Sequence, residues 1–138
     1  MSYAMMRNAN SLYRQTSAQG NVDGADRHQL IAMLLDGLTD GIHRARGHIL
    51  HQDIPAKGRS FSNAIGILGE LRESLDHKAA PKLTARLDAL YDYITRRLLH
   101  AQLNDDLAAL EECQRLLVPI REAWQGIRPT YLAQRSKP

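Results

Sequence analysis

The feature that most constrains the fold is one long amphipathic segment, residues 81–102. Its apolar side chains recur every three or four positions, which places them in one stripe on a helix of about 20 residues. Pro81 suits the first turn of that helix, because the N–H that proline lacks would have no partner there. A helix with one dry face needs partner helices. The stripe consists of Leu83, Leu87, Leu90, Tyr91, Ile94, Leu98 and Ala101.

Three further segments have the same kind of pattern. Asp26 and Gln29 form the sequence signature of a capping box, and Asn104-Asp105-Asp106 is typical of a helix N-cap. The connections are short, so consecutive helices should be antiparallel neighbours. The expected fold class is therefore an all-α, antiparallel four-helix bundle. Its helices are predicted at residues 26–51, 56–77, 81–103 and 105–127.

The remaining segments lack such periodicity. Residues 1–25 are expected to be a mobile N-terminal segment that folds over the bundle domain, which comprises residues 26–128. Residues 129–138 are expected to be a disordered tail.

Pro119 falls inside the last helical pattern, where proline kinks or breaks a helix. Gly37 and Gly41 each cost a helix roughly 1 kcal/mol relative to alanine, which suggests that another segment approaches the first helix closely.

The sequence offers little for catalysis, metal binding or membrane insertion. Cys113, the single cysteine, fits a reducing compartment and lies in an apolar seam, as a buried inert thiol would. Asp40 and His43 have the spacing of di-iron ligands, but Asp40 lies off the apolar stripe. No phosphate-binding loop or catalytic triad is present, and no apolar run approaches the ~18 residues of a membrane span. We therefore expect a cytoplasmic, non-enzymatic protein without cofactor or metal.

The mildly basic charge leaves nucleic-acid binding open as an alternative function. The net charge is +3, with 18 basic and 15 acidic residues interspersed. A small helical nucleic-acid binder is possible but disfavoured, because the basic residues have no aromatic interleaving. A self-contained bundle that acts as an adaptor or oligomerisation module is the other alternative. The basic patch of the nucleic-acid alternative would consist of Arg44, Arg46, Arg96 and Arg97.

Several apolar residues fall beside the main stripes. Some of them neighbour the glycines of the first two helices, and such a combination favours a groove for an amphipathic partner helix. These off-stripe residues are Leu30, Leu34, Ile67, Leu99, Leu103, Leu116 and Val118.

Four groups of residues, in this order and spacing, resemble the FliS-type flagellar export chaperones over residues 13–124. The first helix starts with Asp26-Arg27-His28 instead of the family's Ser-Pro-His, and Lys78-Ala79-Ala80-Pro81 replaces its Gly-Gly. The groups are His28-Gln29-Leu30-Ile31 with Met33-Leu34-Leu35-Asp36-Gly37; Lys57-Gly58 with Ala64-Ile65 and Ile67; Leu90-Tyr91-Asp92-Tyr93-Ile94 with Arg96-Arg97-Leu98-Leu99; and Asn104-Asp105 with Leu116-Leu117 and Arg121-Glu122-Ala123-Trp124.

The resemblance implies a cytoplasmic chaperone that binds the disordered C-terminal region of flagellin. Binding would prevent premature polymerisation and keep flagellin competent for type III export, and the loaded chaperone would contact the export gate. Tyr13 would belong to an N-terminal lid that flagellin displaces. We expect no nucleic acid, no stable membrane insertion, and a monomer or weak homodimer. The expected groove residues are Leu34, Gly37, Ile65, Ile67, Tyr93, Leu99 and Leu116.

Overall fold

The computed structural model describes residues 24–135, and every regular element in this part of the chain is a helix. Four long helices are followed by a short one, which confirms the predicted all-α bundle. The elements are α2 (Arg27–Leu50), α3 (Ile54–Glu73), α4 (Pro81–Asn104), α5 (Leu107–Gly126) and α6 (Arg128–Arg135).

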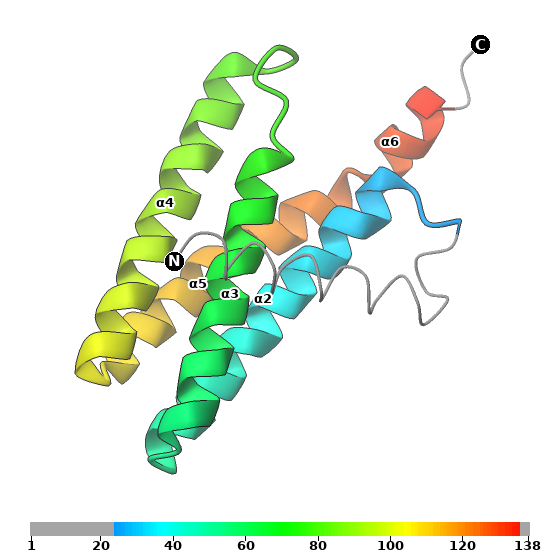
Figure 1. Cartoon of the computed structure of the whole chain (residues 1–138). Helices are drawn as coiled ribbons and strands as arrows, with labels where there is room; N and C mark the ends of the chain where they lie inside the picture. Colours follow the sequence, from blue (N-terminus) through cyan, green and yellow to red (C-terminus); the bar gives the residue numbers. More distant parts are fainter. Residues whose placement is uncertain (1–23, 136–138) are drawn as a thin grey trace.

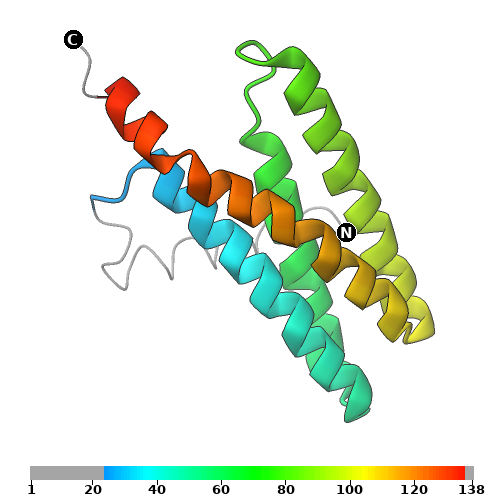
Figure 2. The ribbon, with the colours of Figure 1, turned by 180° about the vertical axis from the view of Figure 1, so that it is seen from behind.

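The four long helices close into a ring. Contacts join α2 to α3, α3 to α4, α4 to α5 and α5 back to α2, so α2 and α4 lie across the bundle from each other. Successive long helices run in opposite directions, whereas α6 continues in the direction of α5 (Figure 1). Seen from behind, α5 lies along α2, and α6 continues past the start of α2 (Figure 2). The antiparallel arrangement follows from the short connections.

Local side chains set the helix starts. The capping box is confirmed, because Asp26 Oδ1 accepts from the Gln29 N–H at 2.8 Å and the Gln29 side chain accepts from the Asp26 N–H at 3.0 Å. Asp53 caps α3 by accepting from the Ala56 N–H at 3.1 Å, with Pro55 in the first turn. The Asp53-Ile54-Pro55 sequence therefore starts α3 two residues before the predicted position.

The later elements differ from the prediction at the end of α3, at the start of α5, which is Leu107 rather than residue 105, and in the tail. α3 ends at Glu73 rather than near residue 77, and the Asp76 carboxylate accepts from the N–H groups of Lys78 and Ala79, forming a turn. α5 runs through Pro119 without a break. The prediction of a disordered tail from residue 129 is wrong for residues 129–135, which belong to α6. Pro129 lies in the first turn of α6, where it is compatible with a helix.

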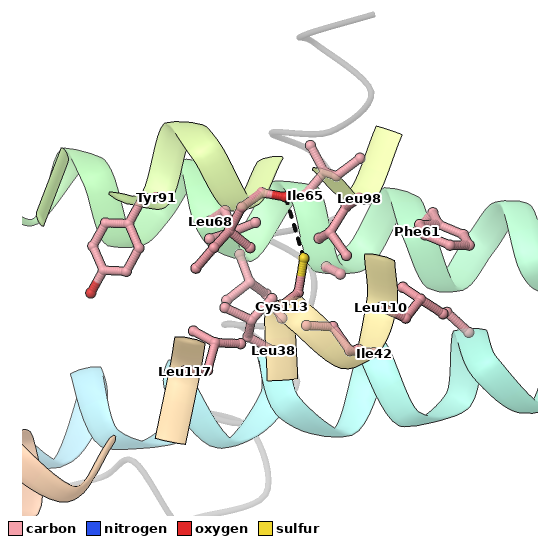
Figure 3. Close-up of a cluster of buried hydrophobic side chains, with 14 of the residues drawn as sticks. Leu38, Ile42, Phe61, Ile65, Leu68, Tyr91, Leu98, Leu110, Cys113 and Leu117 are labelled. Carbon is pink, nitrogen blue, oxygen red and sulfur yellow. Dashed lines mark hydrogen bonds between the residues drawn. The ribbon is translucent and has the colours of Figure 1, made fainter. Parts of the chain in front are cut away.

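The core lies where the apolar stripes of the four long helices meet. It is mainly aliphatic, and Phe61 of α3 is its one phenylalanine, with no exposed surface. Figure 3 shows side chains from all four helices converging around Cys113. On the side of α2 that faces α3, a Cβ added to Gly41 would lie 3.7 Å from the Ala64 Cβ. The helices therefore do come close here, although alanine would also fit.

Candidate functional site

The structure buries three of the predicted groove residues. Leu34, Ile65 and Ile67 belong to the hydrophobic core cluster, and Ile67 is only 1% exposed. Gly37 is half-buried and lies one turn from Leu34 on the same side of α2. Ile67 lies one turn from Ala64, the residue that faces Gly41 of α2. Leu34, Gly37 and Ile67 thus flank the contact between α2 and α3, whereas Ile65 is drawn with Cys113 in the core cluster (Figure 3).

A second pair of predicted residues lies between α4 and α5. Tyr93 of α4 donates its hydroxyl hydrogen to Glu112 Oε2 of α5 at 2.6 Å. Arg97 donates from Nε to Glu112 Oε1 at 2.7 Å, so one carboxylate joins two side chains of the neighbouring helix. Leu116 follows Glu112 by one turn and packs partly buried against the core. Tyr93 and Leu116 therefore lie on one side of the α4–α5 pair.

These contacts determine the electrostatics around Glu112. The hydrogen bond from Tyr93, followed by that from Arg97, lowers the pKa of the Glu112 carboxyl. The same hydrogen bond to Glu112 is the main cause of the raised pKa of Tyr93. Glu112 is therefore an anion that the two donors hold in place, and Tyr93 is a neutral hydrogen-bond donor. This arrangement positions α4 against α5 and contains no nucleophile poised for chemistry.

Leu99 lies apart from both pairs. It is 39% exposed, and Leu103, one turn further along α4, is 84% exposed. Asp92, seven residues before Leu99 and on the same side of α4, pairs with Arg72 of α3, so Leu99 lies on the side nearer α3. Tyr93 is about 120° away around the helix. The structure therefore divides the predicted groove into an α2–α3 edge, an α4–α5 side and an apolar strip on α4.

The remaining sequence predictions have mixed outcomes. Tyr13, the predicted lid residue, lies outside the described residues. The four arginines of the nucleic-acid alternative form no single patch, because Arg44 and Arg46 lie on α2 while Arg96 and Arg97 lie on α4, across the bundle. Carboxylates of Glu111, Asp92 and Glu112 pair with Arg46, Arg96 and Arg97, respectively.

The described residues also allow three other expectations to be examined, which concern metal binding, membrane spanning and the reactivity of the Cys113 thiol. Residues 24–135 contain no group of three or more side chains that could hold a metal ion. No described helix is both long and apolar enough to cross a lipid bilayer. Cys113 is fully buried, and burial raises the pKa of its thiol to about 12, so the residue is an apolar core element rather than a nucleophile.

A cluster of side chains at the start of α2 was not predicted from the sequence. His28 is 2% exposed and stacks on Trp124 of α5, with ring centroids 4.7 Å apart and planes 7° from parallel. The Trp124 indole N–H donates to the His28 carbonyl oxygen at 2.9 Å. Arg128 of α6 pairs with Asp26 on the same side. The sequence showed Asp26 as a helix cap and His28 and Trp124 as motif residues, but it did not show their contacts with one another and with Arg128, which span about a hundred residues.

Comparison with known proteins identifies the family. The family model for "Flagellar protein FliS" matches residues 8–131. A relative in Salmonella typhimurium, named flagellar secretion chaperone FliS, is 41% identical over 91% of this chain and 93% of its own length. The flagellar secretion chaperone FliSB of Pseudomonas aeruginosa is 38% identical, covering 91% and 98%. The Escherichia coli relative, also named flagellar secretion chaperone FliS, is 40% identical, covering 82% and 84%.

These matches span the bundle and agree with the resemblance found in the motifs. The family is one of chaperones, so the prediction that the chain is not an enzyme is confirmed. By these matches the chain belongs to the FliS family of flagellar proteins.

Proposed function

We propose that this chain is a cytoplasmic export chaperone for flagellin. It binds the disordered C-terminal region of flagellin, prevents premature polymerisation and keeps the subunit competent for type III export. The observation that carries this proposal is the match, along nearly the whole chain, to relatives named as flagellar secretion chaperones. The loaded chaperone then contacts the export gate.

Exposed apolar side chains support binding of an amphipathic segment. Leu99 and Leu103 form an exposed pair one turn apart on α4, and Val118 of α5 is 48% exposed. Scaled by their exposed fractions, at about 1.5–3 kcal/mol for full burial, these three side chains would together contribute about 2.5–5 kcal/mol, which is comparable to the ~2–5 kcal/mol needed to order a disordered partner. Burial of apolar surface therefore supplies the free energy of binding, and the proposed mechanism needs no nucleotide.

The buried predicted groove residues fit the proposal only if the free chain covers them. Leu34 and Ile67 are buried in the core cluster, so flagellin can contact them only after a covering segment has moved. We assign that role to residues 1–25, with Tyr13 as the displaceable side chain. Flagellin would then gain Leu34, Gly37 and Ile67 by displacing the lid, in addition to the exposed strip on α4.

A binding experiment tests the main proposal. Purified full-length flagellin and a variant lacking its C-terminal region are compared for binding to this chain by calorimetry. We expect binding of the full-length protein and loss of binding for the truncated one. Equal binding of both would refute the C-terminal mechanism, and no binding of either would favour the adaptor alternative.

The lid requires its own variants. Tyr13→Ala should leave the melting temperature nearly unchanged and increase flagellin affinity, because the competing lid is weakened. Tyr3→Ala, in the same segment, is the matched control and should leave the affinity unchanged. A large loss of stability in Tyr13→Ala would instead make Tyr13 a core residue.

A further inference from the structure

One carboxylate joins the start of α2 to α6. Asp26 Oδ1 and Oδ2 accept from the Arg128 guanidinium at 3.1 and 2.9 Å, and Oδ2 lies 3.4 Å from Arg135 Nη1. The same side chain caps α2 through the Gln29 N–H. The Asp26 side chain is only 7% exposed. Both of the arginines that it contacts belong to α6, which begins about a hundred residues later in the chain. Asp26 therefore holds both described arginines of α6.

His28 completes this contact, and its hydrogen bonds define its protonation state. Nε2 lies 2.6 Å from the carbonyl oxygen of Trp124, which can only accept, so Nε2 carries the hydrogen. Nδ1 lies 3.2 Å from Arg128 Nη1, which can only donate, so Nδ1 must accept. The observed geometry requires a neutral imidazole. The ring also contacts Tyr131 of α6, with centroids 5.6 Å apart.

α6 depends on these contacts for its stability. It has eight residues and none of them is buried. Isolated helices shorter than about 12–15 residues are marginal in water. The helix is therefore stabilised by docking, to which the ion pairs of Arg128 and Arg135 with Asp26 and the contact of Arg128 with His28 contribute.

Protonation of His28 would oppose this docking. A hydrogen on Nδ1 would point at the Arg128 guanidinium and replace an attraction with repulsion between two cations. The charged groups around the ring are Asp26 on α2 and Arg128 and Arg135 on α6, while Trp124 of α5 and the Tyr131 phenol are neutral. One carboxylate would then face three cations.

Asp26 and Arg128 keep their charges near neutral pH. The hydrogen bond from Arg128 lowers the pKa of the Asp26 carboxyl to about 2, so Asp26 remains an anion. Arg27, the neighbour of Asp26 in the chain, donates to the Ser74 carbonyl oxygen at the end of α3. The imidazole is the side chain type that titrates between about pH 5 and 8.

We propose that α6 is a proton-sensitive clasp: it docks on the start of α2 while His28 is neutral and is released when His28 is protonated. The clasp lies at the end of the bundle where α2 begins (Figure 1). It does not depend on flagellin binding.

Trp124 makes the clasp measurable, because it is the single tryptophan of the chain. Its emission is followed in the full chain from about pH 8 to about pH 5. Hydrogen exchange of residues 128–135, corrected for the intrinsic rate at each pH, reports docking of α6 directly. We expect a sigmoidal change in Trp124 emission and a loss of α6 protection of about tenfold with the same midpoint. The amides of α3 and α4 should keep their protection.

Three variants separate the clasp from a general acid effect. His28→Gln keeps one donor and one acceptor but cannot be protonated in this range, so emission and α6 protection should not change with pH. His51→Gln, at the exposed far end of α2, should titrate as the unmodified chain does. Asp26→Asn retains a good N-cap but loses the charge that holds the arginines, so α6 should be unprotected at every pH.

Three results would overturn the proposal. The first is constant Trp124 emission with α6 protected throughout the range. The second is a transition that persists in His28→Gln. The third is a titration of Trp124 emission while the protection of α6 stays unchanged, because His28 would then be protonated without releasing the helix.

Discussion

Leu98 and Leu99 are consecutive residues on α4 with different environments, which makes them a matched pair for alanine substitution. Leu98 has no exposed surface, so Leu98→Ala should cost about 2–5 kcal/mol of folding stability. Leu99 is 39% exposed, and a partner can bury only that fraction. Full burial of a leucine contributes about 1.5–3 kcal/mol, so 39% of it is about 0.6–1.2 kcal/mol. Leu99→Ala should therefore weaken flagellin binding about 3- to 8-fold.

Urea unfolding and calorimetry distinguish the two roles. We expect Leu99→Ala to lose less than half of the stability that Leu98→Ala loses, and Leu98→Ala to bind flagellin with nearly unchanged affinity while it stays folded. Since a domain of this size is stable by about 5–15 kcal/mol, both variants should fold. Unchanged flagellin affinity in Leu99→Ala would refute the assignment of the α4 strip to the binding surface.

Two further predictions concern titrating groups. Because the pKa of Glu112 is lowered by Tyr93 and Arg97, the stability it contributes is present above its unfolded-state pKa and is lost as the pH falls through the lower folded-state value. Urea unfolding between about pH 5 and 3 should therefore show a smaller fall in Glu112→Gln than in the unmodified chain, and an equal fall would contradict the pairing. Because burial raises the pKa of Cys113 to about 12, iodoacetamide should not alkylate the native chain at about pH 8, whereas urea-unfolded chain should react; rapid native labelling would show that the core opens readily.

The fold could be predicted from the sequence because its main signals are local. The stripe on residues 81–102 and the caps at Asp26 and Asp106 each depend on side chains a few positions apart. Boundaries were less certain because one signal can have two meanings. Asp53-Ile54-Pro55 is compatible with a helix end and with a helix start, and the structure uses it as a start.

The candidate site was predicted less well, because the phase of a residue on its own helix does not say which neighbour covers it. Ile67 lies off the stripe of α3 yet is only 1% exposed and belongs to the core cluster. Tyr93 and Leu99 both looked like groove residues, but one hydrogen-bonds to α5 and the other lies on the side nearer α3. Assigning them needs the positions of three helices at once.

The sequence alone determined the helices, the apolar faces that must meet and the family of the chain, since all three depend on residue order and spacing. Only the tertiary structure decided which side chains from distant segments meet. Asp26 pairs with Arg128, and His28 contacts both Trp124 and Arg128, because α5 returns antiparallel along α2 and brings α6 to the start of the bundle. The resulting contact turns a segment that looked like a disordered tail into a docked helix.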